Sequence, residues 1–287
     1  MDVVPYDFVD RVFTKLDSFD IYFLSSQSSP LWMEASRVYK EQLRYLGIEI
    51  VFANDEASFH LQIDSSHRTL PDLTYEGLAS SDSRFIRISN LRIFQGQPNL
   101  GGFQFPTEHL SAIFRSLSHF RIVKLETCAY FPSKDFAYEC LINQFEPERL
   151  YANDFPIADG FLQNQLQSLE LRQLKLLSCG RSDFKSQIEA FVCRERFQSL
   201  ECTFDCLDMD CVKRIVAYWR AMQNAWKSYG PFKIFAPTLK FTTKRDLTDE
   251  FAAWLTPTTN AGEFREENGL STLVVNCDAS SCNIQFT

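Results

Sequence analysis

The start of the chain carries a clear helical pattern. One face of the stretch 6–16 is apolar, because its apolar side chains are separated by one, three, one and three positions. A second stretch, 19–24, is apolar around most of a helical turn. Ser29 and Pro30 then form a typical N-cap and first position of a third helix. The pattern predicts three short helices. The apolar members of the first are Phe8, Val9, Val12, Phe13 and Leu16.

From residue 47 onward the pattern changes to short strand-like runs and then to an alternation of helices and strands. The predicted strands cover 48–52, 59–63, 85–88, 91–94, 121–125, 149–151, 168–177, 199–204, 232–241, 273–275 and 284–286, with a loop ahead of 168. The predicted helices begin at Thr107, Ser133 and Ser182 and near Asp208, and a last one contains Leu247, Phe251, Trp254 and Leu255.

Several predicted strands share a signature of alternating apolar and polar residues, as in 167–171, 198–202 and 270–275. Helix followed by strand, repeated in this way, is typical of a leucine-rich-repeat-like solenoid or an open parallel sheet. The fold class predicted is therefore α/β. A short three-helix module over 1–46 precedes a repeat-like, irregular leucine-rich-repeat-like α/β domain with a mostly parallel sheet over 47–287.

Charge and cysteine usage narrow the class of protein. The net charge of -8 argues against nucleic acid or an anionic membrane as a partner, because such surfaces bind clustered Lys and Arg. No stretch approaches the ~20 continuous apolar residues of a membrane span, and the start lacks the pattern of a signal peptide. The nine cysteines are an odd number, and the chain is large enough to fold without stabilising disulfide bonds. We therefore expect reduced thiols and a cytoplasmic or nuclear protein.

The residues that chemistry would need form no convincing constellation. Cys202, Cys206 and Cys211 are the densest cysteine group, with Cys277 and Cys282 as a second pair, but their spacing is not that of a zinc site. Buried core thiols are the favoured interpretation. The acidic residues Asp205, Asp208 and Asp210 are expected to cap the helix that follows them. None of the four histidines lies in a metal-binding or nucleophile motif, and no phosphate-binding glycine motif is present. We predict no catalytic residues, no metal, no cofactor and no enzymatic activity.

The first 45 residues resemble the F-box, a pattern that opens with Leu-Pro-x-Glu and ends in a tryptophan. The residues that carry the resemblance are Val4, Pro5, Tyr6, Asp7, Phe8, Val9, Val12, Phe13, Leu16, Asp17, Ile21, Phe23, Leu24, Leu31 and Trp32. The chain looks like the nematode-expanded group of F-box and F-box-like proteins. Val4 and Asp7 replace the Leu and Glu of the pattern, and Ser29-Pro30 stands where the family prefers a basic residue.

The resemblance implies a substrate-recognition subunit of an SCF-type cullin-RING ubiquitin ligase. The helices would bind the SCF linker subunit, and through it the cullin scaffold, while the C-terminal domain binds an unknown target protein. All the residues of the pattern except Tyr6, Asp7 and Asp17 are then candidate partner-binding residues. An independent argument also favours a partner, because the apolar turn at 19–24 needs cover. The alternative is that the main domain supplies that cover, and that the helices form the N-terminal cap of a stand-alone protein-interaction scaffold with a degenerate F-box.

Overall fold

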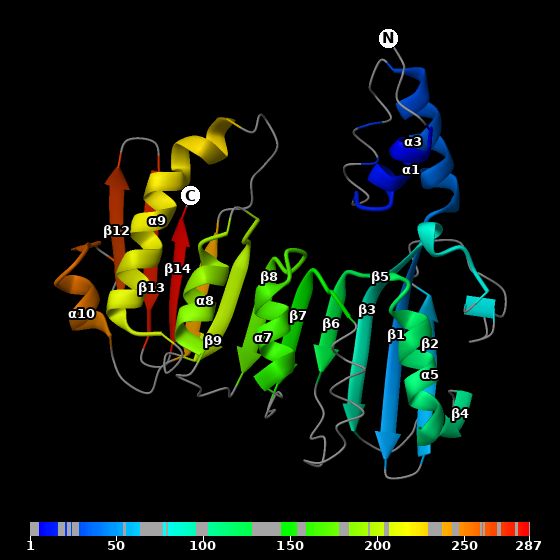
Figure 1. The fold of residues 1–287 in the computed structure, drawn as a ribbon. Helices are drawn as coiled ribbons and strands as arrows, with labels where there is room; N and C mark the ends of the chain where they lie inside the picture. The colour runs from blue at the N-terminus through cyan, green and yellow to red at the C-terminus, as the bar shows by residue number, and fades with distance from the viewer. Residues whose placement is uncertain are drawn as a thin grey trace. The chain divides into compact units, whose positions relative to one another are not determined.

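A computed structural model shows a mixed α/β protein that divides into two compact units (Figure 1). Unit 1 comprises residues 1–92 and 97–123, and unit 2 comprises 93–96 and 124–287. The structure describes residues 6–16, 21, 24, 29–53, 56–63, 77–78, 80–95, 103–127, 145–153, 159–177, 184–194, 196–203, 207–228, 237–242, 247–258, 260, 262–268, 271–278 and 281–286.

Unit 1 joins the N-terminal helices to a small sheet. Strands β1 and β2 form an antiparallel hairpin, and β4 pairs with the other side of β2. β3 lies next to β1, and the short β5 pairs parallel with β3. The elements are α1 (Tyr6–Phe13), α3 (Pro30–Gln42), β1 (Arg44–Ala53), β2 (Glu56–Ile63), η1 (Ser83–Phe85), β3 (Ile86–Gln95), β4 (Phe103–Pro106), η2 (Thr107–His109), α5 (Leu110–Leu117) and β5 (Arg121–Ile122).

The predicted helices of unit 1 are confirmed where the structure describes them. Helix α3 begins at Pro30 with Ser29 as its extended N-cap, although the Ser29 hydroxyl makes no capping hydrogen bond. Of the stretch 19–24, the two described residues, Ile21 and Leu24, are helical. The two strands predicted at 85–88 and 91–94 are one continuous strand, β3. β1 begins at Arg44, so the boundary predicted after residue 46 lies inside this strand, and unit 1 continues to Val123.

Unit 2 combines a parallel sheet with a C-terminal antiparallel meander. Strands β6 to β10 are parallel neighbours in chain order, and helices α7, α8 and α9 lie on one face of them (Figure 1). The elements are β6 (Lys124–Thr127), β7 (Arg149–Asn153), α7 (Asp159–Gln167), β8 (Gln173–Leu177), α8 (Lys185–Val192), β9 (Ser199–Thr203), α9 (Met209–Ser228), β10 (Thr238–Thr242), α10 (Thr248–Ala252), β11 (Thr256–Pro257), β12 (Glu263–Asn268), β13 (Ser271–Cys277) and β14 (Ser281–Phe286).

The parallel strands start at one level. The carbonyl of a residue just ahead of one strand accepts a hydrogen bond from the N–H of a residue just ahead of the next strand. Gln198 N–H donates to Arg172 O (2.9 Å), and Thr238 N–H donates to Gln198 O (3.0 Å). Buried side chains that face the helices occur at every second position along these strands, for example the apolar residues Leu150, Leu174 and Leu200. Short apolar runs with period two therefore form this sheet, and the parallel pairing expected from alternating helices and strands is confirmed from β6 to β10.

The meander after β10 does not follow from helix–strand alternation. β14, β13, β12 and β11 continue the sheet as antiparallel strands, because the connections between β12, β13 and β14 are too short to contain a helix. The sequence does not predict β12, whose residues Glu263–Asn268 are mostly charged or polar, with Phe264 the side chain that is buried.

Further predictions in unit 2 either differ from the structure or lie outside the described residues. Helix α7 occupies part of the predicted loop ahead of 168, and the strand predicted over 168–177 begins only at Gln173. The Arg194 guanidinium donates to the Leu166 and Ser168 carbonyls, which ends α7 and leaves Leu169 80% exposed. The helix predicted from Ser133 lies outside the described residues, as does the 232–236 part of the predicted strand that the structure places at β10.

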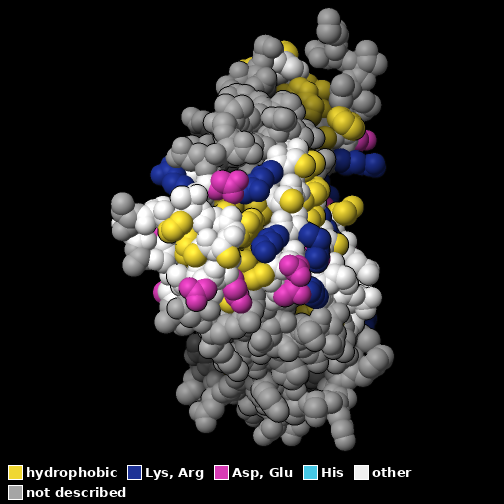
Figure 2. All heavy atoms as spheres, turned by 90° about the vertical axis from the view of Figure 1, so that its left-hand side faces the viewer, with side chains coloured by type: hydrophobic (Ala, Val, Ile, Leu, Met, Phe, Trp, Pro, Cys, Tyr) yellow, Lys and Arg dark blue, Asp and Glu magenta, His cyan; other side chains and the backbone are white. Residues whose placement is uncertain are grey.

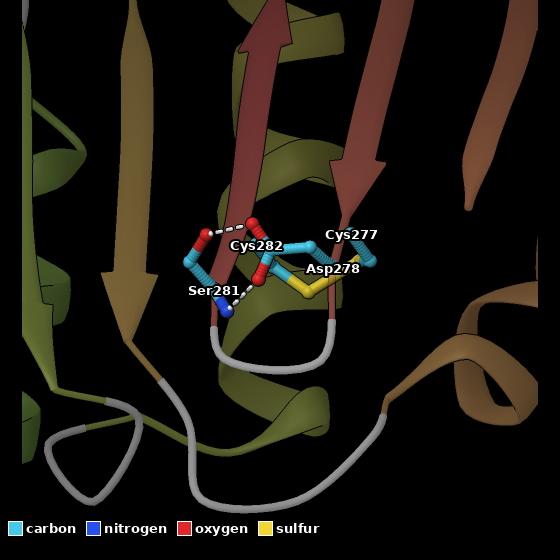
Figure 3. The surroundings of a disulfide bond; sticks show 4 residues. All are labelled: Cys277, Asp278, Ser281 and Cys282. Atoms are coloured by element: carbon cyan, nitrogen blue, oxygen red, sulfur yellow. Dashed lines mark hydrogen bonds between the residues drawn. A yellow bond between two sulfur atoms is a disulfide. The ribbon is translucent and has the colours of Figure 1, made fainter. Parts of the chain in front are cut away.

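The described cysteines include one disulfide, which corrects the expectation that all thiols are reduced. Cys277 and Cys282 face each other as the last pair of the β13–β14 ladder, with Cα atoms 4.2 Å apart, and their sulfur atoms are bonded (Figure 3). The Asp278 carboxylate accepts hydrogen bonds from the Ser281 N–H (2.7 Å) and hydroxyl (2.8 Å). Strand pairing and this turn bring the two cysteines together, which their sequence separation of five alone does not require.

Gly262 is a position where only glycine fits. Its φ is +73°, and a Cβ there would lie 2.2 Å from the carbonyl oxygen of Cys277, whose N–H donates to Gly262 O at 2.8 Å. Gly262→Ala is expected to destabilise the fold by about 2–3 kcal/mol, measured by urea unfolding, since it adds a left-handed strain to a backbone clash.

Gly160→Ala is the matched control, because Gly160 lies in α7 with nothing within 4 Å of an added Cβ. It is expected to be neutral or to stabilise by about 0.5–1 kcal/mol. Equal unfolding midpoints for the two variants would contradict the steric argument at Gly262.

Among the described helices, none has the length and apolar character needed to cross a membrane. On the face drawn in Figure 2, the described Lys and Arg side chains are interspersed with Asp and Glu and with apolar side chains. The charge on this face is therefore mixed in sign.

Candidate functional site

The candidate site is the helical module formed by α1, the segment around Ile21 and Leu24, and α3. Its centre is a cluster of fully or nearly buried side chains, and the rings at its core touch, with centroids of Phe13 and Trp32 5.8 Å apart and those of Phe13 and Tyr39 5.1 Å apart. The buried members are Val9, Phe13, Ile21, Ala35, Tyr39 and Leu43, and the partly buried residues packed against them are Leu16, Leu24, Leu31, Trp32, Tyr45 and Phe85.

The structure divides the predicted partner-binding residues into three groups. Val9, Phe13 and Ile21 have essentially no exposed surface and hold the helices together. Leu16, Leu24, Leu31 and Trp32 pack on this core and are only partly exposed, and Val12 is half-buried. Phe8 is 54% exposed and remains available to a partner. Val4, Pro5 and Phe23 lie outside the described residues.

Two exposed apolar residues of the module were not among the predicted partner-binding residues. Tyr6 in α1 is 45% exposed and Met33 in α3 is 46% exposed. Apolar spacing selects the face that packs on the core, so it selects against residues such as these. Such residues can be found in the sequence as large apolar side chains at positions that the helical period places away from the core.

The apolar turn at 19–24 is covered within the chain, at least at its described positions. Ile21 is buried in the module's core, and its carbonyl accepts a hydrogen bond from the buried Ser36 hydroxyl (2.6 Å). At Ile21, the core of the module itself supplies the cover that the apolar pattern requires.

Tyr39 links the module to the sheet of unit 1. Its hydroxyl donates to the Asp10 carboxylate (2.9 Å), and its ring lies 5.0 Å from the ring of Phe85. Burial, with the hydrogen bond to Asp10 and its charge, raises the pKa of Tyr39. The phenol therefore stays protonated and acts as a donor throughout the physiological pH range.

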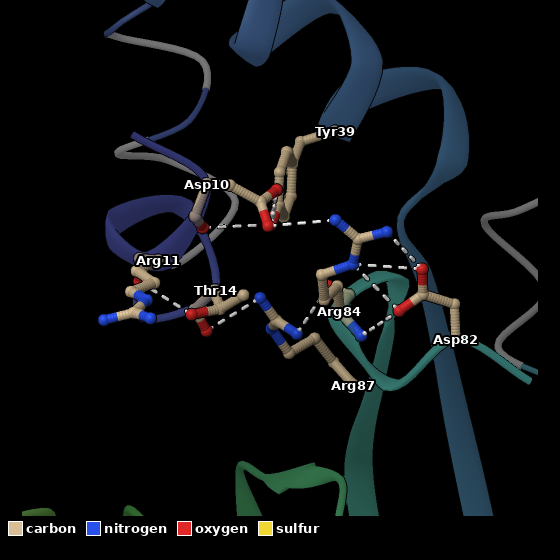
Figure 4. A network of polar contacts seen from close by, with 7 residues as sticks. All are labelled: Asp10, Arg11, Thr14, Tyr39, Asp82, Arg84 and Arg87. Carbon is tan, nitrogen blue, oxygen red and sulfur yellow. Dashed lines mark hydrogen bonds and ion pairs between the residues drawn. The ribbon is translucent and has the colours of Figure 1, made fainter. Parts of the chain in front are cut away.

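Three arginines from η1, β3 and β5 contact α1 and the residues that follow it, and Figure 4 shows two of them, Arg84 and Arg87. Arg84 forms an ion pair with Asp10 (3.0 Å). Arg87, only 2% exposed, donates to the carbonyls of Phe13 (3.3 Å) and Thr14 (2.9 Å). Arg121 donates to the carbonyl of Leu16 (2.9 Å). We call Arg84, Arg87 and Arg121 the arginine clamp.

The clamp provides hydrogen-bond donors to the carbonyls at the C-terminal end of α1. The last carbonyls of a helix lack partners in the helix and carry a partial negative charge, so a buried end needs cationic donors. Arg87 and Arg121 supply these donors from residues more than 70 positions away in the sequence. Arg84 is itself held by Asp82, and this hydrogen bond lowers the pKa of that carboxyl. The clamp therefore makes α1 part of unit 1 rather than a separately tethered helix.

No protein-family model matches the sequence, and no curated protein matches it.

The cysteine candidates have structural surroundings. The Cys211 thiol lies 3.5 Å from a Glu189 carboxylate oxygen, and burial together with the charge of Glu189 raises its pKa to about 12. Burial likewise raises the pKa of Cys193 to about 11. Protonated thiols of this kind are poor nucleophiles and poor metal ligands. Cys202 is buried in β9, and Cys206 lies outside the described residues.

Acidic residues in unit 2 also have a structural role. The Asp208 carboxylate accepts a hydrogen bond from the Cys211 N–H (2.8 Å), so it caps α9 as expected, and it pairs with Lys185. Asp205 lies outside the described residues, and Asp210 is in the first turn of α9. Within the described ranges, three or more His, Cys, Asp or Glu side chains nowhere gather in a way that would hold a metal ion.

Proposed function

We propose that this chain is a non-catalytic protein-interaction subunit that connects a target protein to an SCF-type ubiquitin ligase. The N-terminal helices would form a degenerate F-box that binds the SCF linker subunit, and through it the cullin scaffold. The irregular, leucine-rich-repeat-like succession of helices and strands in unit 2 would present the target-binding surface. Such a role places the protein in the cytoplasm or nucleus.

The observation that supports the proposal is that the module exposes large apolar side chains although its own hydrophobic core is complete without them. Tyr6, Phe8 and Met33 are about half exposed, while the cluster around Phe13 and Tyr39 is buried. Burying a large apolar side chain in an interface yields roughly 1.5–3 kcal/mol, so residues of this kind are natural anchors for a partner. Arg87 and Arg121 hold the C-terminal end of α1, whereas Tyr6 and Phe8 lie in its first turn.

Tyr6→Ala combined with Phe8→Ala is expected to reduce binding of the linker subunit by about tenfold or more, because two exposed anchors are removed while the core stays intact. The measurement is co-purification of the full chain with the linker, followed by titration calorimetry. Circular dichroism checks that the variant retains the helical signal and unfolding midpoint of the parent protein.

Leu169→Ala is the matched control, because Leu169 is an equally large and still more exposed apolar residue in unit 2. It is expected to leave linker binding unchanged. If the unmodified protein forms no complex with the linker, the proposal is overturned. If Leu169→Ala weakens binding as much as the double variant, α1 is not the binding element.

A second function is favoured by a different observation. The arginine clamp and the contact between Tyr39 and Phe85 bind the helices to the sheet of unit 1. These contacts are what a stand-alone scaffold would need if its helices served as an N-terminal cap. The cap function requires the helices for the stability of unit 1 and requires no linker, so the substitution of Arg87 and the linker titration together distinguish the two.

A further inference from the structure

The parallel sheet of unit 2 has one face that no described helix covers. Along β6 to β10 the side chains alternate, and those on the helix-covered face are apolar or small and uncharged. Every charged residue of these five strands lies on the other face. The polar side chains of that open face are half-buried or exposed, namely Lys124, Glu126, Arg149, Tyr151, Gln173, Lys175, Ser199, Glu201, Thr238 and Lys240.

Strand register places these side chains in two rows. One row crosses β6 to β10 through Glu126, Tyr151, Lys175, Glu201 and Lys240, which are successive partners in the pairing of neighbouring strands. Adjacent strands lie about 4.8 Å apart, so Lys175 and Lys240 are roughly 10 Å apart across the sheet, with Glu201 between them.

The charges around Glu201 do not balance. Glu201 pairs with Lys175 (3.0 Å) and also with Lys240 (3.5 Å), so a single carboxylate faces two ammonium groups. One unit of positive charge therefore remains around Glu201, because Glu126, at the β6 end of the same row, pairs with Lys124 of the other row.

The neighbouring strands add to this excess. Lys124 pairs with Glu126 (3.1 Å) and lies 4.2 Å from the centre of the Tyr151 ring. Arg149, the register partner of Lys124, is exposed. The open face thus carries four cations, Lys124, Arg149, Lys175 and Lys240, against two carboxylates, Glu126 and Glu201. This surplus of positive charge lies in a chain whose net charge is -8.

We propose that the open face of β6 to β10 binds an acidic, extended peptide segment of the target protein. This inference rests on the proposed function, for which it names the chemistry of the target. Successive residues of an extended chain advance about 3.4 Å and alternate sides, so acidic residues at every second position share one face and repeat about every 7 Å. The flexible side chains of Lys175 and Lys240 can meet two such carboxylates. The Tyr151 ring and the amide of Gln173 supply apolar and hydrogen-bonding contacts beside the charges.

The test uses the full chain and a fluorescein-labelled twelve-residue peptide that alternates Glu with Ser. Fluorescence anisotropy is measured at low and at physiological salt, beside two peptides in which Gln or Lys replaces every Glu. Binding is expected for the Glu peptide alone, and its affinity should fall as salt rises, because the Debye length shortens from about 30 Å at 0.01 M to about 8 Å at 0.15 M ionic strength.

Variants that remove positive charge and a variant that removes negative charge test whether binding depends on the charges of the open face. Lys175→Gln with Lys240→Gln is expected to weaken binding about fivefold or more, since two exposed cations are lost. Glu201→Gln is expected to tighten binding by about threefold, since it removes the carboxylate that competes with the ligand for both lysines. Lys213→Gln, at an exposed position on α9, is the control and should change nothing.

The inference is overturned if the Glu peptide does not bind, if Glu201→Gln weakens its binding, or if Lys213→Gln weakens binding as much as the double variant. It is also overturned if a single-stranded oligothymidylate binds more tightly than the Glu peptide, because the face would then be a nucleic-acid surface. Linker binding by the same preparation is measured in parallel. A preparation that binds the linker but not the Glu peptide contradicts this inference and leaves the proposed function standing, whereas the reverse result contradicts the proposed function.

Discussion

Replacing Arg87 with alanine is expected to destabilise unit 1 by about 3–4 kcal/mol and to make the segment around α1 accessible to protease. The Arg87 side chain is almost entirely buried and donates to four carbonyls, those of Phe13, Thr14, Arg84 and Ile86. Alanine would leave these oxygens without their cationic donor and would leave a cavity beneath the end of α1. Urea unfolding followed by circular dichroism measures the stability, and limited proteolysis with mass spectrometry locates the opened segment.

Arg92→Ala is the matched control, because Arg92 lies on the same strand, is exposed, and its ion pair with Glu49 is long (3.9 Å). It is expected to change stability by less than about 0.5 kcal/mol. Similar losses in the two variants would show that the clamp does not hold the helices.

The Arg87 variant also separates the two candidate functions. If the helices serve only as a cap, Arg87→Ala should expose the sheet of unit 1 and cause aggregation. If they form a linker-binding module, the cluster around Phe13 and Tyr39 should retain its packing, and linker binding should survive. Measuring linker binding of the variant below its unfolding midpoint gives the answer.

Replacing Trp219 with alanine is expected to cost about 3–5 kcal/mol of the stability of unit 2. Trp219 is fully buried in α9, and its ring stacks on Phe197 with centroids 5.8 Å apart. Its indole N–H donates to the carbonyl of Val192 (3.1 Å), which is in the last turn of α8 and has no partner there within the helix. One side chain thus packs α9 against α8 and satisfies the end of that helix.

Two further variants separate packing from hydrogen bonding at this site. Trp219→Phe keeps most of the ring volume and loses the donor, so its expected cost is about 1–2 kcal/mol. Trp254→Ala is the control for removing a tryptophan, because Trp254 is only half-buried and stacks on Phe251 after α10. A loss for Trp254→Ala equal to that for Trp219→Ala, measured by urea unfolding, would contradict the central role of Trp219.

Local signals in the sequence account for most of the helices. Pro30 after Ser29 predicts the start of α3, and Asp208 predicts the start of α9, because both features act within one turn of their own helix. The missed elements lack such signals. In α7, Asp159–Gln167, polar side chains outnumber apolar ones, and in β12 a single apolar residue, Phe264, is enough once two neighbouring strands supply hydrogen bonds.

The candidate site was only partly predictable for a related reason. Apolar periodicity identifies Val9 and Phe13 as members of a packed face, but a packed face serves the core of a module as readily as an interface. Exposure separates the two uses, and it assigns Phe8, Tyr6 and Met33 to the surface. Exposure depends on which elements meet in space, and the sequence pattern does not contain that information.

The sequence by itself determined the α/β class, the position of the N-terminal helices and the alternation that forms β6 to β10, because helix and strand periods are local properties of the chain. The tertiary structure alone decided three features: the clamp of Arg84, Arg87 and Arg121, the Cys277–Cys282 disulfide, and the open charged face around Glu201. Each requires strand pairing or packing to bring together residues that local sequence does not mark as partners. Arg87 and Thr14, for instance, are 73 positions apart, and only the packing of α1 onto the sheet joins them.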